Sequence, residues 1–315
     1  HKDIGFHTVG DIGYVGSCGR HLTWQRNLNS IPLGTRFLPA NADPVNPKVP
    51  LADVFLTPIR GYNSVGFNEA AGSSNYHSLQ VTANRRFAQN VEFGLAWTWS
   101  KVLDFNDGDF GAVNTVAPLR AWNYGLADFD RTQVVKVNWL WHLPTWKSAF
   151  APVRAVVNSW QLSGIATFSS GAPTGVGYTQ VTPVDLSGTP SISPRILVAG
   201  DPVLPSGERT FDRAFRTDVF RLPAVGTLGT MSKTLLRMPG TNNFDVALFK
   251  NVPIRDRFHV QIRSEFYNAF NHAQFSSFDA TARFDSNGNQ VNSRFGQYTA
   301  ARDPRILQLA VRLQF

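Results

Sequence analysis

Cysteine is nearly absent from this 315-residue chain, in which Cys18 is the only one. A single cysteine excludes an internal disulfide and a cysteine metal cluster. Long apolar runs are missing as well. No uninterrupted stretch of about 18 apolar residues occurs, and the mean hydropathy is −0.17, which excludes transmembrane helices.

Charge is also scarce: only 17% of the residues are charged, whereas about a quarter is usual in soluble domains. The chain is nevertheless 43% hydrophobic and 12% aromatic. A sequence with these properties suits a barrel in which apolar and polar residues alternate.

The net charge is +8, but the basic residues are scattered singly, for example Lys136, Arg263 and Arg312. We therefore predict no nucleic-acid partner. A positive field facing anionic lipopolysaccharide is a further hypothesis.

Catalytic and cofactor motifs are missing. The seven histidines form no H-E-x-x-H cluster, and the sequence has no glycine-rich phosphate motif and no G-x-S-x-G elbow. We expect neither an enzyme nor a cofactor. Residues 104–109 (DFNDGD) resemble a calcium loop, but the glycine stands at the fifth position rather than the sixth. A solvated loop is the favoured interpretation, with weak calcium binding as the alternative. Residues 285–289 (DSNGN) have the same ambiguity, and their Asn-Gly pair favours a hairpin tip.

The last stretch, residues 305–315 (RILQLAVRLQF), has a period of two. One parity carries Leu307, Leu309, Val311, Leu313 and Phe315, and the other carries Gln308, Ala310, Arg312 and Gln314. A helix would place Gln308 and Arg312 among the leucines, so the pattern predicts a β-strand with one apolar face.

The same alternation recurs along the chain. It predicts strands at 78–87, 91–100, 133–143, 160–169, 244–248 and 258–267, with a weaker glycine-rich strand at 5–16. Short connections at 88–90, 144–157 and 252–257 alternate with long ones at 17–73, 104–129, 171–240 and 271–303. Short extended pieces within 20–29 and 63–69 and a short hairpin within 171–240 are alternatives inside those long connections.

Strands of about ten residues match a tilted bilayer span, whereas globular strands average five or six. Outer-membrane barrels also alternate short periplasmic turns with long outer loops. We therefore predict an all-β protein, an antiparallel transmembrane β-barrel. Because an isolated sheet in hydrocarbon must close on itself, the apolar parity would face lipid and the polar parity the lumen.

This assignment predicts which side chains line the lumen: Gln80, Arg86, Glu92, Lys136, His142, His259, Arg263, Glu265 and Arg312. Arg263 and Glu265 share a parity, which favours an ion pair over an acid/base pair. Arg85 is the exception on the apolar parity of 78–87. Tryptophans near strand ends, on the apolar parity, are predicted to form the membrane-interface girdle: Trp97, Trp99, Trp139 and Trp141.

Several segments resemble TonB-dependent receptors of the Oar-like group. These are YVGS at 14–17 with GRHL at 19–22, SNYHSLQ at 74–80 with NRR at 84–86, WTWSK at 97–101, DRT at 130–132, WQLSG at 160–164 and SGAP at 170–173. The most specific are GTNNFDVALFKN at 240–251, EFYNAFNH at 265–272, and FG at 295–296 followed by ARDPR at 301–305. Their order and the terminal Phe315 extend the resemblance over nearly the whole chain.

The resemblance implies a 22-strand barrel, of which about eight spanning strands with long extracellular loops would be present. Residues 1–315 would be its C-terminal part, with the plug, the TonB box and an N-terminal domain upstream. The chain begins at His1 with no initiator methionine or signal peptide, which agrees with a fragment or a processed chain.

The implied function is movement of a bulky, unknown solute across the outer membrane of a Gram-negative-type bacterium, with energy coupled through TonB. The other implied partners are outer-membrane lipid, lipopolysaccharide and the barrel-assembly machinery, which would read Phe315 as an assembly signal. Two alternatives remain open: a plug-less porin or adhesin barrel, and a soluble β-sandwich binding module.

Overall fold

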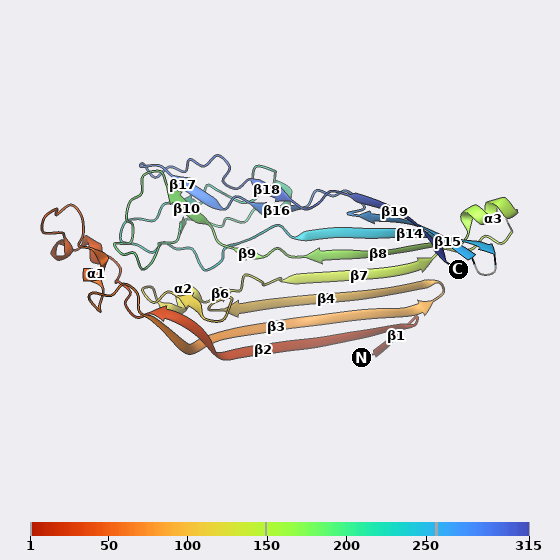
Figure 1. Ribbon diagram of the computed structural model, residues 1–315, viewed down its shortest axis with the longest axis horizontal. Helices are drawn as coiled ribbons and strands as arrows, with labels where there is room; N and C mark the ends of the chain where they lie inside the picture. The colour runs from red at the N-terminus through yellow and green to blue at the C-terminus, as the bar shows by residue number, and fades with distance from the viewer. Residues whose placement is uncertain (1, 149, 256–257, 315) are drawn as a thin grey trace.

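The alternating segments form one long antiparallel sheet in the computed structural model, which describes residues 2–148, 150–255 and 258–314 (Figure 1). The sheet order is β1-β2-β3-β4-β7-β8-β14-β15-β19. A short edge strand, β1 (Lys2–Gly5), precedes the long strands β2 (Thr8–Asn27), β3 (Gly66–Ala88), β4 (Val91–Asp104), β7 (Gln133–His142), β8 (Trp160–Ser169), β14 (Thr241–Arg255), β15 (Phe258–Tyr267) and β19 (Ile306–Gln314).

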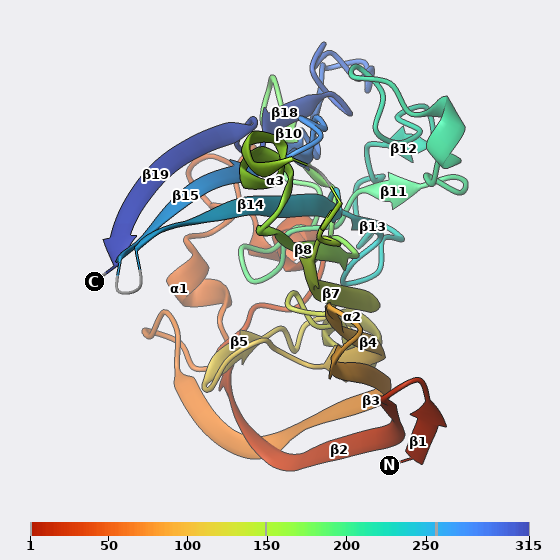
Figure 2. The same ribbon diagram turned by 90° about the vertical axis from the view of Figure 1, so that its right-hand side faces the viewer.

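The sheet curls into a trough instead of closing (Figure 2). Within the described residues β1 and β19 are its two edges, and the short strands β5 (Gly111–Val113) and β6 (Gly125–Leu126) attach beside β2 and β4. The right-handed twist of paired strands gives such a sheet its curvature. This long sheet, here called the wall, therefore has the curvature and the strand length of part of a barrel. A total of 22 strands stays a prediction.

The connections alternate in length as predicted. The β3–β4, β7–β8 and β14–β15 connections lie at one end of the sheet, and the much longer ones lie at the other (Figure 1). Helices occur only as short pieces in the described connections: α1 (Asp53–Leu56), α2 (Leu119–Asn123), α3 (Ala151–Val157) and the 3-10 turns η1 (Thr35–Phe37), η2 (Pro39–Asn41) and η3 (Ser206–Glu208). Among the described residues no helix has the length and apolar character needed to cross a membrane.

The loop predicted at 17–73 is shorter in the structure, because the strands on both sides extend into that range. β2 continues to Asn27 and β3 starts at Gly66, and these two residues are paired partners. The hairpin therefore extends roughly ten residues beyond the span that a bilayer requires. In this extension Trp24 is buried against the Phe105 ring and β5 pairs with β2, so its side chains do not alternate between lipid and a polar interior as in the membrane-spanning part.

The strand register keeps the apolar residues on one face. Leu309 pairs with Ser264 and Val311 pairs with Ile262, and these two side chains of β19 are 70% and 73% exposed. Phe87 is a correction to the predicted alternation. A bulge between Arg85 and Ala88 turns its ring toward His142, with ring centroids 5.1 Å apart. Bulges shift the side-chain parity by one residue.

The main hydrophobic core lies outside the wall, in the long connections. The β8–β14 and β15–β19 connections (residues 170–240 and 268–305), here called the cap, hold a buried cluster around Phe215, whose ring contacts Phe220, Phe278 and Phe295. The predicted loops thus contain short paired strands: β9 (Pro173–Thr174) with β13 (Leu236–Arg237), β10 (Gly177–Gln180) with β17 (Thr281–Phe284), β11 (Leu197–Val198) with β12 (Phe220–Arg221), and β16 (Phe275–Phe278) with β18 (Tyr298–Ala301).

Candidate functional site

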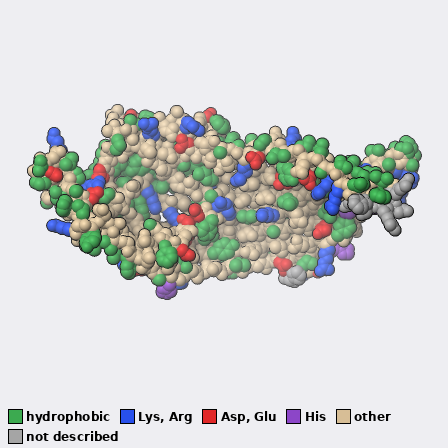
Figure 3. Space-filling model, viewed as in Figure 1, with side chains coloured by type: hydrophobic (Ala, Val, Ile, Leu, Met, Phe, Trp, Pro, Cys, Tyr) green, Lys and Arg blue, Asp and Glu red, His purple; other side chains and the backbone are tan. Residues whose placement is uncertain are grey.

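The concave face of the wall gathers the polar side chains. Following the paired residues from β3 to β19 places eight of the nine predicted lumen residues on a single face: Gln80, Glu92, Lys136, His142, His259, Arg263, Glu265 and Arg312. Arg86 falls within the bulge that interrupts the β3–β4 register. Charged side chains of both signs lie along the middle of the trough (Figure 3).

Arg263 and Glu265 form the expected ion pair on this face. Arg263 Nη2 lies 3.2 Å from Glu265 Oε1, and Tyr267 donates its hydroxyl to Glu265 over 3.2 Å. The Arg263 guanidinium also lies over the Phe249 ring at 4.9 Å. These contacts hold both charges against the wall and engage each of them with a neighbouring side chain.

The four predicted girdle tryptophans lie on the opposite, apolar face. Trp99 pairs with Leu79 toward the end of the long connections, whereas Trp141 pairs with Val91 toward the other end. Val91 precedes Trp99 by eight residues, a separation of about 27 Å along the strand. With strand tilt this becomes about 20 Å across a bilayer, close to the roughly 25 Å apolar band of outer-membrane barrels. Trp97 and Trp139 lie one step inward of these two.

Two cations of the cap, Lys233 and Arg237, form three ion pairs that fasten it to the wall. Lys233 Nζ lies 2.6 Å from Asp104 and 3.3 Å from Asp107, so the acidic loop that resembled a calcium site contacts a lysine ammonium. Arg237 Nη2 lies 2.6 Å from Asp130, which is fully buried. The same carboxylate accepts the Val102 backbone N–H over 2.8 Å. A buried carboxylate needs such partners, because its desolvation in their absence is costly.

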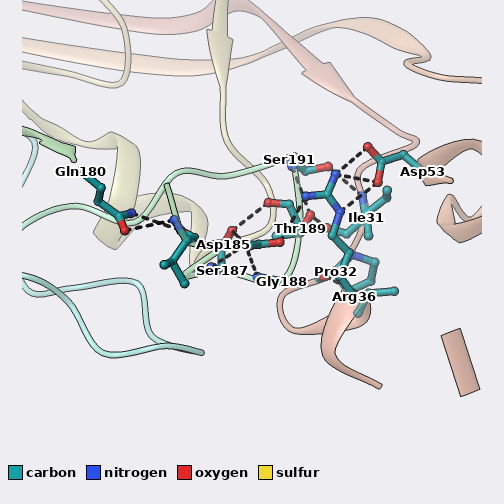
Figure 4. A network of polar contacts seen from close by, with 12 residues as sticks. Ile31, Pro32, Arg36, Asp53, Gln180, Asp185, Ser187, Gly188, Thr189 and Ser191 are labelled. Atoms are coloured by element: carbon teal, nitrogen blue, oxygen red, sulfur yellow. Dashed lines mark hydrogen bonds and ion pairs between the residues drawn. The ribbon is translucent and has the colours of Figure 1, made fainter. Parts of the chain in front are cut away.

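A cavity of about 920 Å³ opens in the cap beside this junction. Its lining includes Arg36, which lies 2.7 Å from Asp53 and 3.1 Å from Asp185 (Figure 4). Burial disfavours the Arg36 charge, but the hydrogen bonds to the two carboxylates outweigh it and raise the pKa of Arg36. Around it Thr189 donates its hydroxyl to the Ile31 carbonyl over 2.7 Å. These contacts join the β2–β3 connection to the β8–β14 connection.

Arg195 and Tyr178 are the groups on the cavity wall best suited to a solute. Within the described residues the Arg195 guanidinium contacts carbonyl oxygens and no carboxylate; it donates to the Trp122 carbonyl over 2.7 Å and lies over the Trp122 ring at 4.0 Å. Burial lowers the pKa of Arg195 and raises that of Tyr178. A cation without a neighbouring carboxylate attracts anionic or strongly hydrogen-bonding groups.

Sequence reasoning did not single out the cavity residues Arg36, Arg195 and Tyr178, nor Lys233. Their partners lie far along the chain, and no local motif marks them. Asp130 did stand in one of the resemblance segments. The remaining predicted site residue, Phe315, lies outside the described residues.

Comparison with known families identifies the wall. A family model described as an outer membrane beta barrel domain matches residues 1–308. This chain belongs to that family. The domain accordingly resides in the outer membrane, which excludes the soluble sandwich alternative.

One solved structure, the outer membrane transporter YddB from Escherichia coli, is similar at a TM-score of 0.45 and 9% identity. The similarity covers 99% of this chain and 31% of the transporter, so the chain spans less than a third of that protein's length. Comparison with curated proteins gave no match.

Proposed function

We propose that this outer-membrane β-barrel domain is part of an Oar-like, TonB-dependent receptor that moves a bulky solute across the outer membrane. One observation carries the proposal: a folded cap with a cavity of about 920 Å³ sits at the long-connection end of a polar trough. A simple pore has little need of a cap with its own aromatic core. A receptor that captures a solute before moving it needs such a surface.

The concave face supplies the wall of the passage. Its charges come in both signs and include the engaged pair Arg263 and Glu265. A wall of this kind offers many weak polar contacts without one deep electrostatic trap, which suits a solute that must bind and then leave. The outer face meets lipid and, at the long-connection end, lipopolysaccharide.

The cap cavity is the capture surface in this proposal. Arg195 and Tyr178 line it together with other residues of the segment 183–196. They suit a solute that carries an anionic or hydroxyl-rich group, because Arg195 has no carboxylate beside it in the described part of the chain. Barrel assembly through Phe315 and energy coupling through TonB are further parts of the proposal, carried by the resemblance in the sequence.

Two measurements test the proposal on the complete outer-membrane protein. The first compares depletion of bulky solutes from a rich medium by cells with and without the protein, before and after a protonophore is added. We expect depletion that requires both the protein and the proton gradient.

The second measurement records the conductance of the purified protein in a planar bilayer. A TonB-dependent receptor should stay closed, whereas a steady open conductance together with uptake that resists the protonophore would favour the plug-less porin. An Arg195→Gln variant should lower uptake, and Arg216→Gln, an exposed arginine that pairs with Asp218, serves as its control.

A further inference from the structure

The β7–β8 connection differs from the other connections at its end of the sheet. The β3–β4 connection is a tight turn at Gln89 and Asn90, whereas residues 143–159 separate β7 from β8 and contain the helix α3. This segment projects at the right-hand end of the molecule (Figure 1). A periplasmic turn has no topological need for this length, since two residues suffice to reverse an antiparallel strand.

The segment leans against the apolar, lipid-facing side of the wall. Lys250 pairs with Trp160 and Ile262, which places it on that face. Its side chain is nevertheless buried, because Nζ donates to the carbonyls of Val156, over 3.1 Å, and Asn158. A lysine on a lipid-facing strand is costly unless its charge finds acceptors. The last turn of α3 supplies them with its unpaired carbonyls.

Further hydrogen bonds fix the shape of the segment. Trp160 donates its indole N–H to the Val156 carbonyl over 2.7 Å. The Asn158 side chain accepts the Trp146 backbone N–H over 2.7 Å and donates to the Trp146 carbonyl over 3.3 Å. Both ends of the segment are thereby joined to each other and to the wall.

What the fixed segment presents outward is apolar and basic. Trp146, Phe150 and Val156 are 60%, 70% and 66% exposed, and hydrophobic side chains surround α3 at the right-hand end of the molecule (Figure 3). Lys147 and Arg154 are exposed between them, and residues 144–158 contain no acidic residue. Aromatic and aliphatic side chains beside cations, without acidic residues, are typical of segments that lie in a membrane interface.

We propose that residues 144–148 and 150–158 form an interfacial anchor that lies in the periplasmic leaflet of the outer membrane and binds anionic phospholipid headgroups. The anchor continues the lipid-facing surface next to Trp141, a girdle residue at the same end. Its cations complement anionic headgroups, and its apolar side chains enter the acyl boundary. The anchor would hold the wall at a fixed depth in the bilayer, which goes beyond the proposed transport function and does not depend on it.

A fluorescence experiment on the purified protein, reconstituted in vesicles, tests this. Because Cys18 is the only cysteine, a Cys18→Ser background permits one environment-sensitive label at Phe150→Cys. Leu309→Cys on the lipid-facing strand is the membrane control, and Asn287→Cys in an exposed cap loop is the aqueous control. We expect lipid-borne quenchers to quench the label at position 150 as strongly as the label at 309. Aqueous iodide should quench the two labels equally weakly.

The charge requirement is tested by lipid composition. Quenching of the label at position 150 by lipid-borne quenchers should be stronger in vesicles containing phosphatidylglycerol than in vesicles of pure phosphatidylcholine. Removing one positive charge, by Lys147→Gln or by Arg154→Gln, should lower the equilibrium ratio of membrane-bound to water-exposed segment in the anionic vesicles by up to about five-fold. A label at 150 that behaves like the one at 287 would overturn the proposal. Protection from both quenchers would also overturn it, because the label would then be buried within the protein or between two copies of it.

Discussion

Replacing Leu309 by arginine should lower the free energy of unfolding far more than the same replacement on the concave face. Leu309 lies one residue from the centre of the nine-residue strand β19 and is 70% exposed on the apolar face. An arginine on the lipid face near the bilayer midplane costs about 2–4 kcal/mol. At roughly 1.4 kcal/mol for each factor of ten, the folding equilibrium should fall by about 30- to 1,000-fold.

The matched control is the neighbouring residue. Gln308 pairs with Glu265 on the concave face, where an added arginine remains in polar surroundings and meets a carboxylate. Gln308→Arg should therefore change the unfolding free energy by no more than about 0.5 kcal/mol. The assay is reversible denaturant unfolding of the complete protein in liposomes, followed by tryptophan fluorescence. Equal losses in the two variants would refute the assignment of the apolar face to lipid.

Three further predictions concern the cap. Arg237→Met leaves the fully buried Asp130 without its cation and should cost about 3–5 kcal/mol, seen as faster proteolysis of the cap; Arg237→Lys should restore part of the loss. Burial raises the pKa of Tyr178. The neutral tyrosine therefore contributes fully to the free energy of unfolding below the ordinary pKa of about 10, and this contribution is lost as the pH rises through the pKa of the folded state. Thermal unfolding should show this alkaline loss, and Tyr178→Phe should remove it. Gly188 has φ +64°, and an added Cβ would lie 2.7 Å from the Phe37 ring; Gly188→Ala should lower the melting temperature, whereas Gly207→Ala, with open space around it, should not.

The membrane-spanning strands could be predicted from the sequence because their cause is local. A strand between lipid and a polar interior records the two environments in alternate residues, as Leu309 and Gln308 show in β19. The alternation therefore predicted the strands and the residues that share a face, while the girdle role of the tryptophans stays a prediction. It failed where its cause is missing. The extensions of β2 and β3 continue past the bilayer span, and at Phe87 a bulge shifts the parity.

The cap and its cavity were decided by tertiary structure alone. Lys233 meets Asp104 across 129 residues of chain, and Arg237 meets Asp130 across 107. Phe215 belongs to a core that draws on two separate connections. No periodic pattern marks such contacts, because each depends on where the wall places the ends of its strands. The sequence by itself thus determined a one-faced wall in the outer membrane, and only the folded connections determined the cap and its cavity.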